Sequence, residues 1–205
     1  MVVSDNLRYK AEGSDAAKTT AHAAKIVNEI NAIYQSEARF SPRIKIVLVS
    51  QVVWVHGDPG SVKAIQSGAN VVSGQLLDVF GSWHASAGVM NDHPHDNAMI
   101  FTGLQFEGST VGKAVVCGMC RQTYSSSVNM IRMQATDAGN VATAAHELGH
   151  NFCMDHDAAG STYLMAPSSG GGNEPTSFSS ASATYLNGYF TDWRYESARQ
   201  CLDND

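Results

Sequence analysis

Apolar residues recur every three or four positions in two stretches of the chain, which is the spacing of a helix face that packs on a core. In the first stretch, residues 15–37, these positions are Ala16, Ala23, Ile26, Val27, Ile30, Ile33 and Tyr34. In the second, from about Val62 to Trp83, they are Ala69, Val72, Leu76, Leu77, Phe80 and Trp83. The pattern predicts two amphipathic helices, the second with a weak point at Gly68 and Gly74.

Three apolar runs predict strands. Residues 44–54 have the sequence IKIVLVSQVVW, which is too apolar on both faces for a surface hairpin and predicts a central strand of a helix-flanked sheet. Residues 98–102 and 113–116 predict two shorter strands around a loop at 105–112. A turn at 57–60 and a polar loop at 91–97 separate the elements. This order of helices and strands predicts an α/β domain with a mixed sheet.

The last third of the chain begins with another helix and then becomes irregular. The apolar face of this helix is formed by Val141, Ala144, Ala145 and Leu148. Asp137 or Asn140 can cap its beginning. After residue 156 the sequence is rich in Gly and Ser, notably at 168–173, and a final helix is predicted at about 179–199.

The composition is typical of a globular domain. The 205 residues fit one domain, with 43% hydrophobic and 16% charged residues. No apolar run approaches the ~18 residues of a membrane span. A net charge of −6 without a basic cluster argues against nucleic acids or anionic membranes as partners. The first residues lack the pattern of a signal peptide, so we expect Met1 to begin a trimmed mature domain, and a monomer is the default expectation.

Residues 146–157, with the sequence HELGHNFCMDHD, predict a catalytic zinc site. His146 and His150 are four residues apart, so on a helix both imidazoles lie on one face and can reach one ion. His156 adds a third ligand if the helix ends soon after His150 and the chain doubles back. Three protein ligands leave one tetrahedral position open, as in catalytic zinc sites. Glu147 is then placed to activate a zinc-bound water as the general base.

Other interpretations of the histidines stay open at this point. A metal-free helix with surface histidines at 146 and 150 has the same spacing. The cluster His93-Pro94-His95 could form an extra metal site, or it could belong to a loop that Asp96 helps to fix.

The cysteines are Cys117, Cys120, Cys153 and Cys201, an even number that is compatible with two disulfides and an extracellular protein. The CxxC at 117–120 could instead be a redox pair or half of a structural zinc site. It ends a strand-like run rather than beginning a helix, which disfavours the redox interpretation. Residues three apart on a strand point to opposite faces, so Cys117 and Cys120 are poor partners for each other.

These residues resemble the metzincin metallopeptidases and, within that clan, the adamalysin or reprolysin (ADAM-type) family. The clan signature is HExxHxxGxxH, and Asp157 after the third histidine favours the adamalysin branch. Met165, in the run YLMAPS at 163–168, resembles the Met-turn, where it would form an apolar base beneath the ligands. Similar segments occur at 26–54, 76–83, 95–103 and 112–120, so nearly the whole chain is covered.

The resemblance implies a metzincin-type α/β fold with a mixed, mostly parallel five-stranded sheet, flanking helices and the zinc helix as the floor of a cleft. It divides residues 1–205 into an upper subdomain to about residue 151 and a small irregular lower subdomain at about 152–205 that ends in a C-terminal helix. The implied activity is that of a secreted zinc endopeptidase, with a protein or peptide substrate extended along the edge strand at 110–118. Substrate contacts are implied for Gly112, Lys113, Ala114, Val115, Val116, Thr143, Ala166, Pro167 and Ser168.

The chain also departs from the family. Only Val2 and Val3 remain of the first strand. A family calcium site would use Asp96, the carbonyl of Cys201 and Asn204, but its glutamate would fall before Met1. Cys120 and Cys201 match the family bridge that ties the C-terminal helix to the upper sheet.

Cys117 and Cys153 stand where the family has glycine, and we predict that they pair. A side chain in a left-handed turn at Cys153 costs ~1 to 2 kcal/mol, which a bridge worth ~3 to 4 kcal/mol would offset. The alternative is two separate buried thiols.

Two functions compete with the endopeptidase. One is a catalytically silent, adamalysin-like binding module; such domains commonly lose the glutamate or a histidine, and all four positions are intact here. The other is a zinc enzyme that acts on something other than peptides, against which the edge-strand and Met-turn resemblance argues.

Overall fold

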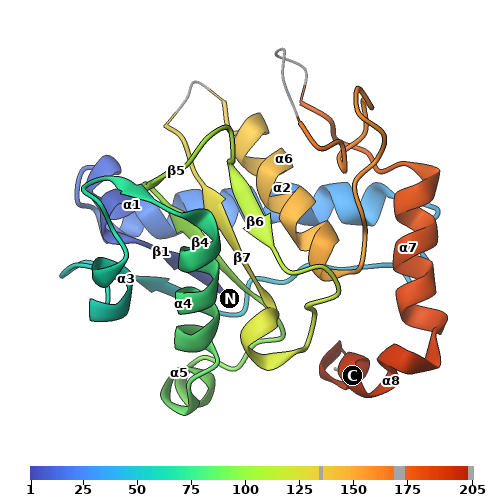
Figure 1. Cartoon of the computed structure of the whole chain (residues 1–205), viewed down its shortest axis with the longest axis horizontal. Coiled ribbons are helices and arrows are strands. Elements are labelled where there is room, and N and C mark those ends of the chain that lie inside the picture. Colours follow the sequence, from blue (N-terminus) through green and yellow to red (C-terminus); the bar gives the residue numbers. More distant parts are fainter. Residues whose placement is uncertain (134–135, 169–173, 203–205) are drawn as a thin grey trace.

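The computed structural model of the chain describes residues 1–133, 136–168 and 174–202, and its centre is a five-stranded sheet (Figure 1). The strand order is β2-β1-β4-β7-β6, in which all neighbours are parallel except β6, which is antiparallel to β7. The mixed, mostly parallel sheet confirms the predicted fold class. The strands are β1 (Val2–Ser4), β2 (Gln51–Val53), β4 (Ala98–Thr102), β6 (Gly112–Ala114) and β7 (Ser126–Met130).

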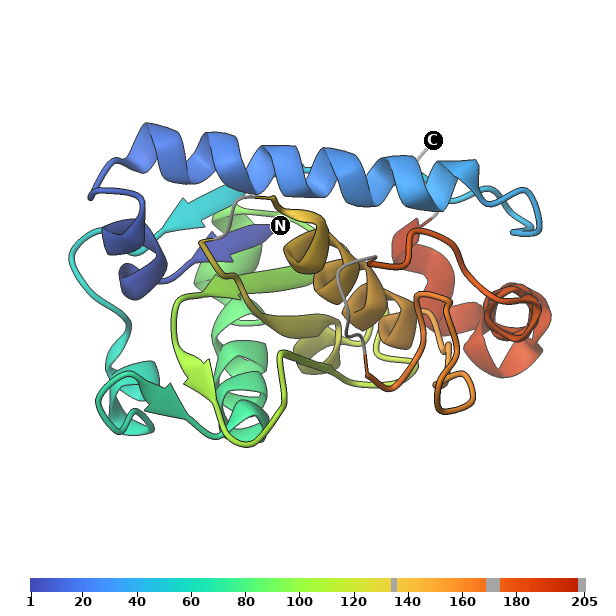
Figure 2. The ribbon, with the colours of Figure 1, turned by 90° about the horizontal axis from the view of Figure 1, so that it is seen from above.

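Helices cover both faces of the sheet. The long helix α2 (Ala16–Ser36) lies on one face beside α6 (Ala138–Asn151), and α4 (Ser73–His84) lies on the other (Figure 2). Strand β4 illustrates why both faces need a covering layer, because alternate side chains of a strand point to opposite faces of the sheet. Met99 and Phe101 belong to the hydrophobic cluster that contains α2 and α6, whereas Ala98 and Ile100 belong to the cluster that contains α4.

The predicted helix at 62–83 is wrong as a single element. It is replaced by α3 (Gly60–Ala64), the short strand β3 (Asn70–Val71) and α4. Gly68, at the predicted weak point, has a φ of +65°, a left-handed conformation that glycine adopts without the steric cost that a side chain would bring. Strand β3 pairs in parallel with β5 (Gln105–Phe106), which lies inside the predicted loop at 105–112.

The predicted central strand at 44–54 is also corrected. Only residues 51–53 form a strand, and β2 lies at one edge of the sheet rather than in its centre. The apolar run before it packs only partly: Ile44 is buried, but the side chains of Val47 and Val49 are 57% and 60% exposed. The apolar composition of residues 44–54 therefore did not distinguish a central strand from a short edge strand that follows a segment without regular secondary structure.

Strand β7 was not predicted, although it lies between β4 and the edge strand. Its sequence is SSVNM, and Ser126, Ser127 and Asn129 are all fully buried. Part of this polar surface is paired internally: the Asn129 side-chain amide donates to Ser127 Oγ at 3.0 Å, whereas Asn129 Oδ1 accepts no hydrogen bond from the described residues. Backbone pairing with β4 and β6 holds this strand in the sheet, but the strand lacks the apolar pattern on which the prediction relied.

The remaining elements are short or lie near the C-terminus. The predicted final helix at 179–199 is shorter, ending at Thr191, and the predicted loop at 91–97 begins inside a helix. No described helix is long and apolar enough to cross a membrane. The division into upper and lower subdomains stays a prediction. The elements are α1 (Asn6–Ala11), α5 (Ala87–Asp92), α7 (Ser180–Thr191), α8 (Glu196–Arg199) and three short 3₁₀ turns, Gln122–Tyr124, Trp193–Tyr195 and Gln200–Leu202.

Candidate metal centre and active-site cleft

Helix α6 carries His146, Glu147 and His150 and ends at Asn151, directly after the last of them. Its apolar face packs between α2 and the sheet, so the opposite face is left for the histidines. Cys153 then has a φ of +67°, which turns the chain back toward the helix. The helix end and the left-handed turn together return His156 to the two helical histidines.

The three histidines converge on one point. The Nε2 atom of His156 lies 3.2 Å from that of His146 and 3.1 Å from that of His150, and all three ligand atoms lie within 4.8 Å of one another. Nitrogen ligands at 2.0 to 2.1 Å around a tetrahedral zinc ion are separated by about 3.3 Å. The spacing fits one zinc ion. Among the described residues, no other group of three or more His, Cys, Asp or Glu side chains is so arranged.

Backbone carbonyls orient two of these imidazoles. His146 Nδ1 lies 2.8 Å from the carbonyl oxygen of Leu164, and His150 Nδ1 lies 2.8 Å from that of Met154. A carbonyl can only accept, so each Nδ1 carries the proton and each Nε2 presents a lone pair. Burial lowers the pKa of His146 to about 4 and also lowers the pKa of His150. Both rings are therefore neutral at pH 7, the form that binds metal.

These two carbonyls could not be predicted. A backbone carbonyl is present in every residue, so Leu164 and Met154 have no side-chain signal for the role they play. Only the folded path of the chain brings them to the rings.

Glu147 lies in the wall between α6 and the edge strand. Its side chain is 6% exposed, and burial raises the pKa of its carboxyl to about 8, while the charge of Lys113 acts in the opposite direction. Gly112 in β6 lies directly against it, since a Cβ atom on Gly112 would be only 2.5 Å from Glu147 Oε1. Glycine is thus required for the edge strand to pass so close to this carboxyl.

Met165 and Asp157 support the lower side of the site. Met165 is fully buried, and a Cβ atom on Gly149 of α6 would lie 2.7 Å from its Sδ atom, so the thioether packs directly beneath the helix. The Asp157 N–H donates to the carbonyl of Met165 at 2.8 Å, and the Asp157 carboxylate accepts from Ser179 Oγ at 2.5 Å. Asp157 therefore links the segment after the third histidine to the beginning of α7.

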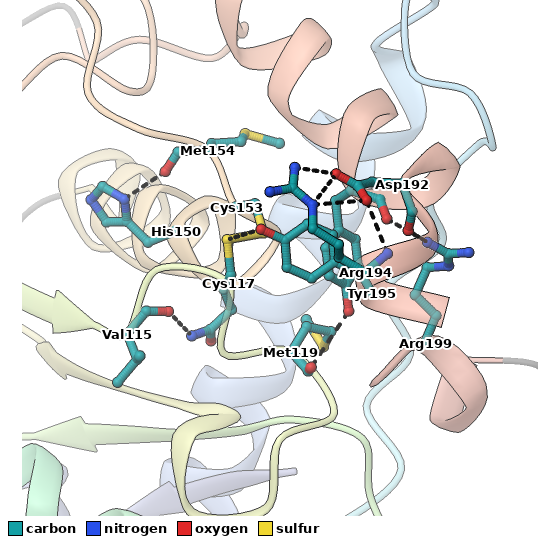
Figure 3. Close-up of a disulfide and its surroundings, with 12 residues drawn as sticks. Val115, Cys117, Met119, His150, Cys153, Met154, Asp192, Arg194, Tyr195 and Arg199 are labelled. Carbon is teal, nitrogen blue, oxygen red and sulfur yellow. Dashed lines mark hydrogen bonds and ion pairs between the residues drawn. A yellow bond between two sulfur atoms is a disulfide. The ribbon is translucent and has the colours of Figure 1, made fainter. Parts of the chain in front are cut away.

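Both predicted cysteine pairs are joined: Cys117 to Cys153, which Figure 3 shows, and Cys120 to Cys201. The backbone N–H groups of Cys117 and Cys153 both donate to the carbonyl of His150, at 2.8 and 2.9 Å. This shared acceptor holds the two residues side by side. Cys117, like Cys153, has a left-handed backbone, with a φ of +58°, where glycine is normally favoured.

The predicted cap of the zinc helix is wrong in detail. Asp137 occupies the N-cap position, but its side chain makes no capping hydrogen bond. Its carboxylate instead bonds His22 Nε2 at 2.6 Å and Lys25 Nζ at 2.7 Å, which ties the beginning of α6 to α2. Asn140 lies within the helix and bonds the backbone of Arg132.

A cleft of about 620 Å³ runs past the three histidines between the edge strand and the segment at 164–168. Val115 does not line it; its side chain packs against the core cluster that contains α4, and its carbonyl accepts from Asn151 Nδ2 at 3.0 Å. Val111, within the predicted edge segment 110–118, also lines the cleft, and so do Met130, Arg132 and Glu174, which were not predicted. The predicted residues that line it are Gly112, Lys113, Ala114, Val116, Thr143, Ala166, Pro167 and Ser168.

Two further predicted groups lie away from the cleft. The calcium set stays a prediction, because Asn204 is outside the described residues and only Asp96 and Cys201 can be placed. Within the part of the chain that the structure describes, His93 and His95 belong to no group of three converging metal ligands: His93 Nδ1 bonds Ser50 Oγ at 2.7 Å, and His95 Nδ1 bonds the carbonyl of His93 at 2.5 Å.

The fold and the three-histidine site define a metzincin-type zinc metalloprotease domain. More narrowly, the chain belongs to the reprolysin (M12B) family of zinc metalloproteases, whose model matches residues 1–205. It is 35% identical over 158 residues to disintegrin and metalloproteinase domain-containing protein 19 of Homo sapiens, which covers 77% of this chain and 15% of that protein. It is also 31% identical over 173 residues to disintegrin and metalloproteinase domain-containing protein 12 of Mus musculus. That match covers 83% of this chain and 18% of the relative. The chain thus spans less than a fifth of these relatives.

Solved structures agree on the fold. Archaemetzincin from Methanopyrus kandleri superimposes with a TM-score of 0.60 at 14% identity, covering 93% of this chain and 94% of that one. A chain in the structure of a chaperone-substrate complex gives a TM-score of 0.62 at 14% identity, covering 92% and 32%.

Proposed function

We propose that this domain is an active zinc-dependent endopeptidase that hydrolyses internal peptide bonds of proteins. The observation that carries the proposal is the meeting of three converging imidazoles with a buried carboxyl, Glu147, in one open cleft beside the edge strand β6. When bound, zinc lowers the pKa of a coordinated water to about 7 and polarises a scissile carbonyl.

Glu147 is the proposed general base. It belongs to no ligand set, and its carboxyl faces Gly112 on the edge strand, where a peptide bond would lie. The carboxylate accepts a proton from the attacking water and then delivers it to the departing amine. Burial raises the pKa of the Glu147 carboxyl, which favours keeping the proton on Glu147 between the two steps. The positive charge of Lys113 acts in the opposite direction and favours its release.

The substrate is proposed to lie extended along β6 and to add itself as another strand. Among the described strands, β6 is last in the sheet and pairs only with β7, so its other edge can form backbone hydrogen bonds with a peptide. The side chain next to the scissile bond would enter the cleft near Thr143 and the segment Ala166, Pro167 and Ser168. Backbone pairing would supply most of the affinity, and this pocket the selectivity.

Location and assembly are part of the proposal. Two disulfides are typical of an oxidising compartment, which favours a secreted or extracellular domain. We expect a monomer in solution.

The activity is tested with a mixed peptide library and mass spectrometry of the products. We expect cleavage at internal bonds, loss of cleavage with a chelator, and recovery when zinc is added back. A silent binding module would bind zinc and leave the library intact. A zinc enzyme with another substrate would also leave it intact, so intact peptides in the presence of bound zinc would overturn the proposal.

A further inference from the structure

A second recess lies next to the cleft, on the other side of the Cys117–Cys153 bridge (Figure 3). Its volume is about 870 Å³. We call it the aromatic recess, because aromatic side chains are prominent in its lining. The lining includes both cysteines of the bridge and Val116, Tyr185, Tyr189, Trp193 and Tyr195.

We propose that the aromatic recess is a second recognition pocket, which takes an apolar, preferentially aromatic, side chain of the substrate several residues before the scissile bond. The inference rests on the proposed peptidase function and extends it to a substrate class, peptides with such a side chain at a fixed distance from the cut.

Exposed apolar side chains gather at this recess. Val116 is 47% exposed, Tyr185 45% and Trp193 79%. Large apolar side chains scattered singly over a surface need no explanation, but several around one concavity mark a binding site. Tyrosine and tryptophan offer a large contact area and lose little conformational entropy when they bind.

The recess is preformed by bonds that fix its inner wall. The Tyr195 hydroxyl lies 3.7 Å from Cys117 Sγ, and its ring centroid lies 5.1 Å from that of Tyr189. Arg199 Nη1 donates to the carbonyls of Tyr189 and Asp192, at 2.7 and 2.9 Å. A pocket that exists before binding requires little reorganisation, so an entering side chain keeps most of its gain in contact energy.

The two opposite charges at the recess, on Asp192 and Arg194, are already paired, which favours an apolar occupant. The Asp192 carboxylate forms an ion pair with Arg194. One carboxylate oxygen of Asp155 accepts from the backbone N–H of His156 at 2.8 Å. A charged substrate side chain would therefore compete with existing contacts, whereas an apolar one would cover the exposed rings.

The recess is continuous with the cleft. Val116 and Asp155 line both of them. Because Glu147 lies against Gly112, the scissile bond of the substrate is placed beside Gly112. Val116 is four residues farther along the chain. Strand β6 ends at Ala114 and residues 116 and 117 form a turn, so the separation is at most roughly 13 Å, the length of four extended residues.

The direction of the peptide follows from pairing preference. Antiparallel pairs outnumber parallel ones, and an antiparallel peptide would have its amino-terminal part beside Val116. The side chain that reaches the recess is then the third to fifth before the scissile bond.

The test uses one parent peptide with Ala at the third, fourth and fifth positions before the scissile bond, and three variants of it, each with Phe at one of these positions. We expect kcat/KM for the Phe peptides to exceed that of the Ala peptide roughly tenfold at the best position. Trp193→Ala and Tyr185→Ala should reduce this ratio to about two or less. Tyr124→Ala removes an aromatic ring that is 51% exposed and lines neither cavity, so it is the matched control and should keep the ratio.

A binding measurement separates the two proposals. Fluorescence anisotropy with the Glu147→Gln variant should give tighter binding of the Phe peptide, again dependent on Trp193. Cleavage without a Phe preference would overturn the recess alone. Preferential, Trp193-dependent binding without any cleavage by the unmodified protein would overturn the peptidase and support the recess. Neither preference nor cleavage would overturn both.

Discussion

Two groups of three histidines in this chain differ in what they can bind. The zinc group is His146, His150 and His156; the second group is His84, His93 and His95. The rings of His84 and His95 approach as closely as zinc ligands do, with His84 Nδ1 3.0 Å from His95 Nε2. Burial lowers the pKa of His84 to about 3 and that of His146 to about 4, so low basicity is common to both groups.

The difference lies in where the lone pairs point. In the zinc group, backbone carbonyls hold the Nδ1 atoms of two rings, and all three Nε2 atoms face one point in an open cleft. In the second group, the His95 Nε2 lone pair is taken by His84, and His93 is bonded to Ser50. Histidines form a metal site only when their surroundings orient free lone pairs together.

The largest expected effect separates the groups by mutation. His156→Ala removes an exposed ligand, so the fold should persist while zinc affinity and kcat/KM both fall by at least about 10³-fold. His93→Ala should change neither by more than about threefold. Metal content by mass spectrometry and peptide cleavage provide the two readouts. Loss of zinc in the His93→Ala variant would contradict the distinction between the zinc group and the second group.

Metal removal gives the next effect. Free zinc at a thousand times its Kd should raise the free energy of unfolding by about 4 kcal/mol, because the unfolded chain lacks the converged site. His156→Ala should abolish this gain, and His93→Ala should keep it. Urea denaturation with and without zinc measures it; an equal gain in both variants would mean that zinc binds elsewhere.

Acidification should reveal the second group. The pKa of His84 is about 3 in the folded chain, below its ordinary 6.5, because of burial and then the charge of His95. The unfolded state therefore binds more protons between these values, and stability falls as pH falls through that window. Metal-free protein should lose about 2 kcal/mol more from pH 7 to pH 5 than the His84→Gln variant does. Parallel losses in the two proteins would mean that His84 does not titrate as described.

The same contrast explains what the sequence could predict. The zinc group was predictable because His146 and His150 are spaced to lie on one helix face and His156 follows at the family's offset, and Asp157 and Met165 extended that signal to the family. Nothing in the sequence around His84 showed that it would meet His95, since the contact joins the end of α4 to a loop after α5.

Prediction of the fold failed where tertiary pairing overrides local pattern. Strand β7 is rich in Ser and Asn, yet it is buried because its backbone pairs with β4 on one side and β6 on the other. The apolar run at 44–54 predicted a central strand, and the chain uses its last part at an edge. The cleft was predicted in outline, but Val115 points to the opposite face, which depends on a register that the sequence does not show.

The central claim is that the zinc group and Glu147 act together but hold different tasks, metal binding and proton transfer. Glu147→Gln tests it most directly when zinc content and peptide cleavage are measured on one sample, with Glu29→Gln on the exposed face of α2 as the control. The account predicts about one zinc per chain and a fall in kcat of roughly 10² to 10⁴-fold for the Glu147 variant alone. Full activity in that variant would contradict it.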